Sequence, residues 1–564
     1  MNETSDTASE ARRASLFRDL LAGRRRLVVW GATGDARYAL FQFPVRPVFL
    51  VDSDTAKWGM RVGGVEVVGP DRLAGEEPER TVVMLLPQAE DLRSLLETAV
   101  SRIGAFPLLP AFSVERDAGL LARAAEGIET PAAAAARDLG RPIEEALAAA
   151  LRAGAPPPSG DANRVVLFTE RLTLGGSERQ ICRLASGLAR AGLASRLIVT
   201  SQRLPHTERL EQFLDAAGVP VDVLPPPRDD WTGPAVPPSA GQQSSALADV
   251  IRRVPVDLQH AILMSLRTLE QCRPGLVIAY MERAGVIAGL AALLAGVPRV
   301  LISLRSLDPT HFSQYFPYGT DWYAKTLALL ANWPGVRMVA NSAAGAQACA
   351  RWMGLPAGTL GVIANTFPDA WEREEAHAAA PLLRTRLGIR TCAPLIAGVF
   401  RMVEEKQPHL FLEVLEALRT RHPDLRAVLV GDGPLRAALE ASLPRRDLAG
   451  VVSFVGGQPD ALPYMAAADL LLHTAAFEGM PNVHLEAQSL GRPVASFAVG
   501  GVLETMAPVL HPLAAPASDV SALVERVDAL ITDSIRREQL GADSRAWVEE
   551  RFGMHRLIQA CLDW

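Results

Sequence analysis

The feature that most constrains the fold is the segment FEGMPNVHLE, which ends at Glu486 near the C-terminal end of the chain. An apolar run over 470–472 precedes it and indicates a buried strand. Pro481 stands where a helix should begin, and Gly491 is typical of a helix end. The pattern therefore predicts a strand-to-helix turn, with Glu478 on the turn and Glu486 about two turns into the helix.

A turn of this kind suits a phosphorylated ligand. The first backbone N–H groups of a helix have no partner within the helix, and together with the helix dipole they favour an anion. The carboxylate of Glu478 can then act near a reacting sugar, while Glu486 can accept hydrogen bonds from ribose hydroxyls.

The segment resembles the E-x7-E signature of retaining glycosyltransferases of family 4, which have the GT-B fold of two Rossmann-like domains. The likeness continues through EAQSLGRPV to Gly500, Gly501 and Glu504. The resemblance implies that the C-terminal domain binds a nucleotide-sugar donor, with Glu478 in a catalytic role. The further donor-binding residues that it implies in this segment are Gly479, Met480, Pro481, Asn482 and Glu486. A solvated helix face with ordinary charges is the alternative.

Length and composition bound the class of protein. A chain of 564 residues is too long for one hydrophobic core, so about three domains are expected. The net charge of −6 gives no reason to expect nucleic acid as a partner. Five scattered cysteines without a C-x-x-C pair argue against a zinc site and fit a reducing cytosol. No signal peptide or membrane-spanning run is visible, so we expect a cytoplasmic protein and leave open a peripheral contact with the inner face of the membrane.

Apolar strands alternate with helical segments along the chain, which predicts an α/β fold. We expect a GT-B fold of two Rossmann-like domains preceded by an additional small Rossmann-like domain. The expected ranges are a leader (1–22), the small Rossmann-like domain (23–115), a helical segment with a linker (116–160), the GT-B N-terminal or acceptor domain (161–368), the GT-B C-terminal or donor domain (369–550) and a C-terminal crossover helix (551–564).

The acceptor domain opens with a strand and the loop ERLTLGGSER. Gly175 and Gly176 would let a helix N-terminus approach a ligand without a Cβ clash, and Ser177 is a good N-cap. The loop resembles the GGSER opening of family-4 enzymes, where it lies over the donor phosphates and beside the acceptor. An ordinary tight turn is the alternative.

Two cations lie on the loop after the first strand of the donor domain. A guanidinium fork from Arg401 and the point charge of Lys406 would stabilise the charge that develops on a leaving nucleoside diphosphate. They match the G-R-x-x-x-x-K pattern of the family, although the order here is G-V-F-R. Gly431 and Gly433 match a family strand end where the nucleotide approaches. No metal and no cofactor are expected, because the cations would do the work of a metal and the nucleotide sugar is a substrate.

Two positions depart from the family pattern. Many members carry a histidine near the reacting sugar, and here Arg305 stands in its place. A cation there could bind an anionic sugar or an acceptor phosphate, and a structural arginine is the alternative. Members also often place a serine before the E-x7-E block, so that hydroxyl is either supplied here by Thr474 or absent.

The N-terminal residues resemble the small Rossmann-like domain that binds the UDP-sugar in sugar acyltransferases. Gly31 and Gly34 would cradle a phosphate at a helix N-terminus, and Asp52 would hold a ribose. Asp35 replaces the catalytic histidine of those enzymes and no β-helix follows, so acyl transfer is not expected. A docking or regulatory domain without a ligand is an equal alternative.

The resemblance implies a retaining glycosyltransferase that moves a sugar from a nucleotide sugar, UDP-linked by analogy, to a glycan, lipid-linked or protein acceptor. Such an enzyme would act in the synthesis of a bacterial surface polysaccharide or glycoconjugate. Two other functions stay open at this point. One is a pseudoenzyme that only binds a nucleotide sugar, and the other is a bifunctional enzyme whose first domain modifies the sugar.

Overall fold

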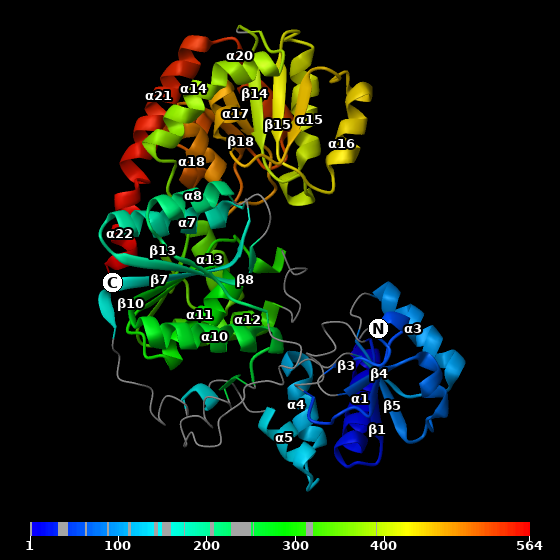
Figure 1. The fold of residues 1–564 in the computed structure, drawn as a ribbon. Coiled ribbons are helices and arrows are strands. Elements are labelled where there is room, and N and C mark those ends of the chain that lie inside the picture. The colour runs from blue at the N-terminus through cyan, green and yellow to red at the C-terminus, as the bar shows by residue number, and fades with distance from the viewer. Residues whose placement is uncertain are drawn as a thin grey trace.

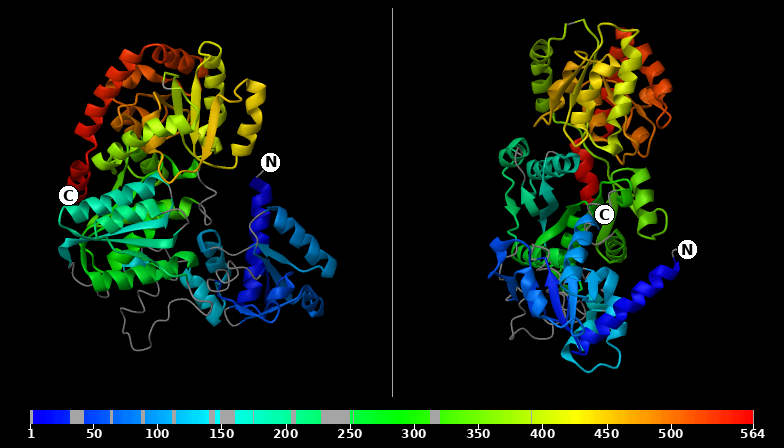
Figure 2. Two further views of the ribbon diagram at one scale, coloured as in Figure 1. Left: turned by 45° about the horizontal axis from the view of Figure 1, so that its top comes forward. Right: turned by 90° about the vertical axis from the view of Figure 1, so that its right-hand side faces the viewer.

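The computed structural model contains three α/β units, each built on one sheet that is wholly or mainly parallel (Figures 1 and 2). It describes residues 3–31, 43–62, 65–86, 90–110, 114–139, 145–148, 160–173, 175–203, 208–226, 250–251, 253–311, 320–390 and 392–563. The N-terminal unit lies apart from the C-terminal unit in every view, and the middle unit contacts the C-terminal one (Figure 1).

The N-terminal unit has the strand order β3-β4-β2-β1-β5-β6. Its strands are β1 (Arg26–Trp30), β2 (Phe49–Val51), β3 (Arg61–Val62), β4 (Val65–Val68), β5 (Thr81–Leu85) and β6 (Leu108–Pro110). Its helices are α1 (Glu3–Leu21), α3 (Glu90–Ile103), α4 (Val114–Ala124) and α5 (Pro131–Leu139). Successive side chains of β1 point to opposite faces, so Leu27 and Val29 pack with α1 and α4, whereas Val28 and Trp30 pack with α3.

The first helix is part of this unit's core. The sequence predicts a leader with a short helix over 1–22, whereas α1 runs over 19 residues. Four of its side chains are at most 7% exposed: Leu16, Phe17, Leu20 and Leu21. Their spacing places them on one helical face, which packs against α4.

The alanine-rich segment over 116–160 is divided between two units. Helices α4 and α5 pack on the N-terminal sheet. A helical turn at 145–148 instead places Ala146 and Leu147 in the core of the middle unit. Residues 149–159 of the expected linker lie outside the described residues.

The middle unit has the strand order β13-β12-β11-β10-β7-β8-β9. Its strands are β7 (Asp161–Leu172), β8 (Ala194–Arg203), β9 (Val221–Val223), β10 (Pro274–Tyr280), β11 (Val300–Leu304), β12 (Val336–Ala340) and β13 (Gly361–Val362). Its helices are α7 (Gly176–Arg190), α8 (Glu208–Ala216), α10 (Val256–Cys272), α11 (Glu282–Leu294), α12 (Thr320–Ala331) and α13 (Ala343–Trp352). Strand β10 is buried along its whole length, as expected for the centre of a parallel sheet covered on both faces.

The C-terminal unit has the strand order β16-β15-β14-β17-β18-β19. Its strands are β14 (Leu395–Val399), β15 (Arg426–Val430), β16 (Val452–Gly456), β17 (Leu470–His473), β18 (Val494–Phe497) and β19 (Ala514–Ala515). Its helices are α14 (Ala370–Arg386), α15 (Pro408–Arg419), α16 (Arg436–Ser442), α17 (Leu462–Ala467), α18 (Asn482–Ser489), α19 (Val502–Thr505), α20 (Val520–Ile531) and α21 (Ser534–Arg551). The strand order reverses between β14 and β17, and ligand crevices of open α/β sheets form at the carboxyl ends of such neighbouring strands.

The last helix, α22 (Met554–Leu562), follows α21 and packs on α7 of the middle unit. Leu557 and Cys561 are buried in the core of that unit. The carbonyl of Leu562 also accepts a hydrogen bond from Arg299 at 2.9 Å. The chain therefore returns from the C-terminal unit to the middle unit before it ends.

Candidate active site

The carboxyl ends of β14 and β17 bring Lys406 and Glu478 together. Lys406 ends the short 3-10 helix η4 (Glu404–Lys406) that follows β14, and Glu478 lies on the turn between β17 and α18. The Lys406 ammonium lies 2.5 Å from Oε1 of Glu478. Seventy-two residues separate the two side chains, and the reversal of strand order explains why they meet.

Glu478 has a second nitrogen partner, which the sequence argument missed. Nε2 of His473, the last residue of β17, lies 3.2 Å from the same Oε1 atom. Among the described residues no hydrogen bond or ion pair is made to Oε2, so this oxygen can still accept from a ligand. Burial alone would raise the pKa of Glu478, but Lys406 and His473 outweigh burial and hold this pKa well below 4.5. Glu478 is therefore a carboxylate at neutral pH.

A line of hydrogen bonds continues from His473 into the C-terminal unit. Nδ1 of His473 lies 3.0 Å from Nε2 of His484, and Nδ1 of His484 lies 3.0 Å from the hydroxyl of Thr505. That hydroxyl lies 2.6 Å from the carbonyl oxygen of Val502. His484 belongs to the EGMPNVH segment, but no local pattern predicted that it would meet a residue at the end of β17.

The glycine pair after β18 shapes the backbone around Glu478. Gly501 donates its N–H to the Glu478 carbonyl at 2.9 Å. A Cβ at Gly500, where φ is +50°, would lie 2.1 Å from the same carbonyl. Glu504, which follows this loop, accepts hydrogen bonds from the first N–H groups of α13, at 2.6 and 2.9 Å. The turn that carries Glu478 is thus fixed between the middle and C-terminal units.

Arg401 does not join the Lys406–Glu478 pair. Its side chain is 56% exposed and pairs with Glu405 at 3.0 Å. Gly431 and Gly433 support the loop that carries it, since a Cβ at Gly431 would lie 1.9 Å from the Phe400 carbonyl and one at Gly433 would lie 2.4 Å from that of Met402. These glycines allow the backbone of the loop to approach the end of β15 closely.

The hydroxyl of Thr474 is turned toward the Lys406 loop. It donates to the carbonyl oxygens of Lys406 and Gln407, both at 3.2 Å. The Thr474 side chain is fully buried. This hydroxyl therefore fixes the backbone of the loop that carries Lys406.

The start of α18 contacts the middle unit through amide side chains. Oδ1 of Asn482 accepts a hydrogen bond from Asn365 at 2.5 Å and one from Gln180 at 3.2 Å. Asn365 also donates to the Met480 carbonyl at 3.3 Å. Pro481 is the N-cap residue of α18. A Cβ at Gly176 would lie 2.5 Å from the Asn482 side chain, so glycine is needed for this close approach.

Helix α7 begins earlier than the sequence predicts. Ser177 was expected as the N-cap, but Gly175 holds that position without a side-chain cap. The Ser177 hydroxyl donates instead to Glu178, which also accepts from Thr173 at 3.0 Å. A Cβ at Gly175 would lie 2.2 Å from the Glu178 carboxylate, and burial raises the pKa of Glu178. Glycine at 175 makes room for this folded-back side chain.

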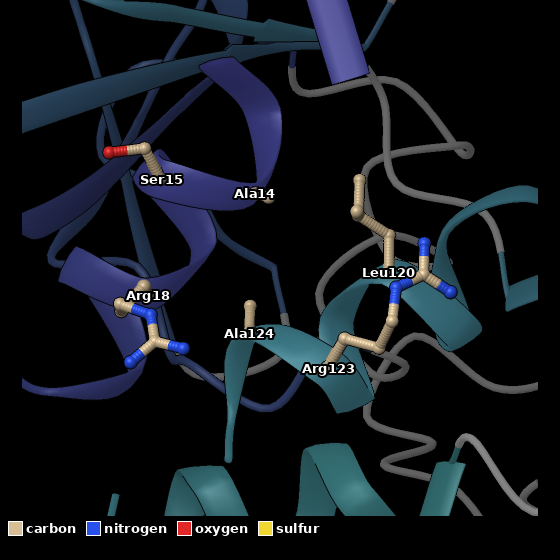
Figure 3. A pocket seen from close by; sticks show the side chains of 6 residues that line it. All are labelled: Ala14, Ser15, Arg18, Leu120, Arg123 and Ala124. Carbon is tan, nitrogen blue, oxygen red and sulfur yellow. The ribbon is translucent and has the colours of Figure 1, made fainter. Parts of the chain in front are cut away.

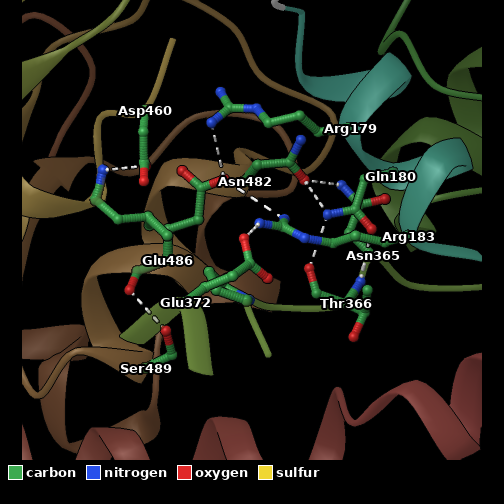
Figure 4. Close-up of polar contacts among 12 residues, drawn as sticks. Arg179, Gln180, Arg183, Asn365, Thr366, Glu372, Asp460, Asn482, Glu486 and Ser489 are labelled. Carbon is green, nitrogen blue, oxygen red and sulfur yellow. Dashed lines mark hydrogen bonds and ion pairs between the residues drawn. The ribbon is translucent and has the colours of Figure 1, made fainter. Parts of the chain in front are cut away.

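Glu486 lies in a buried charge cluster between the two units (Figure 4). It is the fifth residue of α18, so it lies about one turn into the helix rather than two. Its Oε1 lies 3.5 Å from Arg179 and 3.8 Å from Arg183, both on α7. Arg183 also pairs with Glu372 at 2.8 Å. Both carboxylate oxygens of Glu486 are buried, and neither has a hydrogen-bond partner among the described residues.

Arg305 follows β11 and is 9% exposed. Its guanidinium lies 4.1 Å from the centre of the Tyr280 ring and donates to Ser303 at 3.0 Å and to Asn365. Among the described residues no carboxylate pairs with it, and burial lowers its pKa. Asn365 thus links Arg305 to Asn482.

Two of the predicted ligand residues of the N-terminal unit, Gly31 and Asp52, lie apart from this site (Figure 1). Gly31 follows β1 and donates to the Val51 carbonyl at 2.8 Å, while Gly34 lies outside the described residues. Asp52 is 7% exposed and accepts from Lys57 at 3.2 Å and from the Asp54 N–H at 2.8 Å. These contacts already occupy both carboxylate oxygens of Asp52.

A cavity of about 320 Å³ lies between α1 and α4 of the same unit (Figure 3). None of the predicted ligand residues lines it. Its lining consists of Ala14, Ser15, Arg18, Leu120, Arg123 and Ala124.

Metal-binding clusters and membrane-spanning helices are both absent from the described residues. These residues contain no group of three or more histidine, cysteine or carboxylate side chains placed to hold a metal ion. They also contain no helix long and apolar enough to cross a membrane.

The comparisons with known proteins agree with this geometry. Residues 381–547 match the family of group 1 glycosyl transferases. The Vi polysaccharide biosynthesis protein VipC/TviE of Salmonella typhi is 29% identical over 361 residues, which is 62% of this chain and 61% of that protein. The 2-deoxystreptamine N-acetyl-D-glucosaminyltransferase of Streptomyces fradiae is 28% identical over 67% of this chain and 88% of its own length.

Solved structures show the fold. Anabaena HepE in complex with UDP-glucose superposes with a TM-score of 0.53 at 21% identity, over 71% of this chain and 98% of that protein. The sucrose-phosphate synthase of Thermosynechococcus elongatus superposes with a TM-score of 0.52 at 16% identity, over 70% of this chain and 96% of its own. The middle and C-terminal units therefore have the GT-B glycosyltransferase fold, which confirms the predicted fold class.

Proposed function

We propose that this chain is a retaining glycosyltransferase that moves a sugar from a UDP-linked donor to a glycan, lipid-linked or protein acceptor. Its role would be in the synthesis of a bacterial surface polysaccharide or glycoconjugate, in the cytoplasm. The observation that carries the proposal is the Lys406–Glu478 pair at the switch point of a group 1 glycosyl transferase domain. The names of the two relatives and the UDP-glucose in HepE support the substrate class.

The proposed chemistry needs positive charge beside the leaving diphosphate. As the bond between the sugar and the phosphate breaks, negative charge grows on the phosphate oxygens. Lys406 and the N-terminus of α18 would stabilise this charge, and the exposed Arg401 would turn toward it when the donor binds. The acceptor hydroxyl attacks the anomeric carbon on the face that the diphosphate leaves. Its proton passes to a phosphate oxygen, so the configuration is retained and the scheme requires no metal ion.

The carboxylates have different proposed roles. Oε2 of Glu478, which no described group contacts, would accept a hydrogen bond from a hydroxyl of the donor sugar. Both oxygens of Glu486 would accept from the ribose hydroxyls, because they have no other hydrogen-bond partner. Gly175, Gly176, Gly479 and the residues Met480 to Asn482 would form the wall of the donor site at the boundary of the two units.

Arg305 has the environment of an anion-binding residue. It is buried without a partner carboxylate, and its present partners are a ring and two neutral oxygens. An anionic group on the donor or acceptor would complete its charge balance. We propose that Arg305 binds a carboxylate-bearing sugar or an acceptor phosphate.

Release of nucleoside diphosphate from a panel of nucleotide sugars, with and without acceptor extract, tests the proposal. We expect release with a UDP-linked sugar, unchanged in excess EDTA, and NMR of the product should show the donor's anomeric configuration. Activity that EDTA abolishes and Mg²⁺ restores would contradict the mechanism. Binding without turnover on every donor would favour the pseudoenzyme, and a chemically altered donor sugar would favour the bifunctional enzyme.

A further inference from the structure

The contacts around His473 determine where the protons of this buried chain of hydrogen bonds lie. The Val502 carbonyl can only accept, so the single hydroxyl proton of Thr505 points to it at 2.6 Å. The Thr505 oxygen must then accept from Nδ1–H of His484, at 3.0 Å. His484 therefore carries a proton on Nδ1. The contact between Nε2 of His484 and Nδ1 of His473 holds one further proton, and the Glu478 carboxylate beside His473 favours its placement on His473, which leaves His484 neutral with a lone pair on Nε2.

The same reasoning fixes both nitrogens of His473. Its Nδ1 lies 3.0 Å from the lone pair of His484 and must donate to it. Its Nε2 lies 3.2 Å from the Glu478 carboxylate, which can also only accept. With His484 neutral, a neutral His473 would have only one N–H and would leave one of these contacts with two acceptors facing each other at hydrogen-bond distance.

We infer that His473 is a positioning residue held permanently as an imidazolium by His484 and Thr505, so that Glu478 is fixed between two cations. The catalytic consequence of this inference rests on the proposed function, whereas the proton positions do not. Lys406, Glu478 and His473 together then carry one net positive charge beside the place proposed for the leaving diphosphate.

Other groups around His473 agree with this assignment. His473 is 2% exposed and His484 is fully buried. The centre of the Phe400 ring lies 6.5 Å from that of the His473 ring, and this apolar side chain has no atom that could accept the His473 protons. Burial first, and the charge of His473 second, hold the pKa of His484 well below 6.5, as expected if His484 is neutral and His473 charged.

The direct test is NMR of the full chain labelled with ¹⁵N-histidine, with the His473 signals assigned by their loss in His473→Asn. We expect both ring nitrogens of His473 to carry protons at neutral pH. A single protonated nitrogen at neutral pH would overturn the inference. This readout needs no substrate, so a failure of the proposed function would leave it unaffected.

Thr505 provides a matched pair of variants. Thr505→Val keeps the shape of the side chain but removes the acceptor for Nδ1–H of His484, so His484 should move its proton to Nε2 and His473 should become neutral. Thr505→Ser keeps the hydroxyl and should restore the wild-type proton pattern. Ser489→Ala, which also loses a buried hydroxyl bonded to a backbone carbonyl, controls for the loss of a hydroxyl as such.

The same variants test the catalytic consequence. In Thr505→Val we expect kcat to fall roughly tenfold with little change in KM, less than the loss from removing a direct transition-state donor. Thr505→Ser should keep the wild-type kcat and pH profile, because its hydroxyl restores the proton pattern. Equal kcat values and pH profiles for Thr505→Val and Thr505→Ser would overturn the inference, whichever variant is more stable.

Discussion

At the scale of single residues, the account depends on Glu478 and its partners. Glu478→Gln keeps the size of the side chain but removes the charge that Lys406 and His473 balance. We expect kcat to fall by about 10²–10³, because a charged contact in a closed site is lost. Glu404→Gln is the matched control, since Glu404 lies on the loop next to Lys406 and is exposed. Similar kcat values for the two variants, in steady-state kinetics with the true donor, would contradict the assigned role.

The same side chains predict a pH dependence of stability. The folded-state pKa of His484 lies well below 6.5, so the unfolded state takes up this proton first and stability is lost as the pH falls below 6.5. The folded-state pKa of Glu478 lies below 4.5, so its contribution is present above pH 4.5 and is lost as the pH falls further.

Denaturant unfolding of the C-terminal unit across this pH range checks the prediction. For each proton that the unfolded state binds and the folded state does not, the free energy of unfolding should fall by about 1.4 kcal/mol per pH unit as the pH is lowered. In His484→Leu the free energy of unfolding should depend less on pH below pH 6.5. In Glu478→Gln it should depend less on pH below pH 4.5. Curves parallel to the wild type in both variants would contradict the pKa directions.

Sequence reasoning found some of these residues and missed others for a physical reason. Lys406 and Glu478 belong to local motifs, so each could be named separately, although their contact required the strand order. His473 and His484 meet across 11 residues and two different elements. Arg183 and Glu372 pair across 189 residues. Contacts of this kind depend on the packing of elements, which a local pattern does not specify.

At the scale of elements, the glycines at the end of β15 hold the Arg401 loop. Gly431→Ala would place a Cβ 1.9 Å from the Phe400 carbonyl at a φ of +138°. We expect the loop to shift and calorimetry to show roughly tenfold weaker binding of UDP, about 1.4 kcal/mol. Gly457→Ala is the control, because its Cβ would meet nothing within 4 Å. Equal affinities in the two variants would show that the loop does not depend on Gly431.

Helix α22 should stabilise the middle unit, although it is the last element of the chain. Leu557→Ala removes a side chain that is 4% exposed in the core of that unit. We expect a loss of about 2–5 kcal/mol in the free energy of unfolding. Leu382→Ala, at a side chain that is 56% exposed, should lose far less. If thermal unfolding shifted equally in both variants, α22 would not be part of the core.

The elements were more predictable than their ends. The apolar run at 470–472 was sufficient to predict a strand, because parallel strands buried on both faces read as continuous apolar segments. The start of α7 was misjudged because Ser177 bonds to the neighbouring Glu178 instead of capping the helix. The length of α1 was underestimated because the sequence of its first turns is polar, whereas its buried face, from Leu16 to Leu21, lies in the second half.

At the scale of the whole molecule, the N-terminal unit should be separable from the middle and C-terminal units, but the stability of the truncated protein depends on the residue at which it begins. A chain that begins at Asp161 lacks Ala146 and Leu147, which are buried in the middle unit. A chain that begins at Glu144 keeps them. We expect the longer truncated protein to be more stable by about 2–5 kcal/mol and to bind UDP as the full chain does. Identical stability of the two, in thermal unfolding, would mean that the 145–148 turn adds nothing to that core.

The function of the N-terminal unit can be tested with the same truncated protein. If residues 1–115 dock a partner, transfer to a small soluble acceptor should survive their removal while transfer to the native acceptor falls. If they hold a second nucleotide sugar, calorimetry with the donor on full-length Glu478→Gln should show two binding sites. Adding Asp52→Ala to that protein should remove one of them. One site in both proteins would leave docking as the remaining role.

The measurement that tests the central claim most directly is the rate of UDP release from UDP-linked sugars by the wild type, Glu478→Gln and Glu404→Gln under the same conditions. The account predicts acceptor-dependent release by the wild type and Glu404→Gln, and a rate about 10²–10³ lower for Glu478→Gln, whose affinity for UDP itself changes little. Equal rates in all three proteins, or release by none of them while UDP binds, would contradict the claim that Lys406 and Glu478 form the active site of a glycosyltransferase.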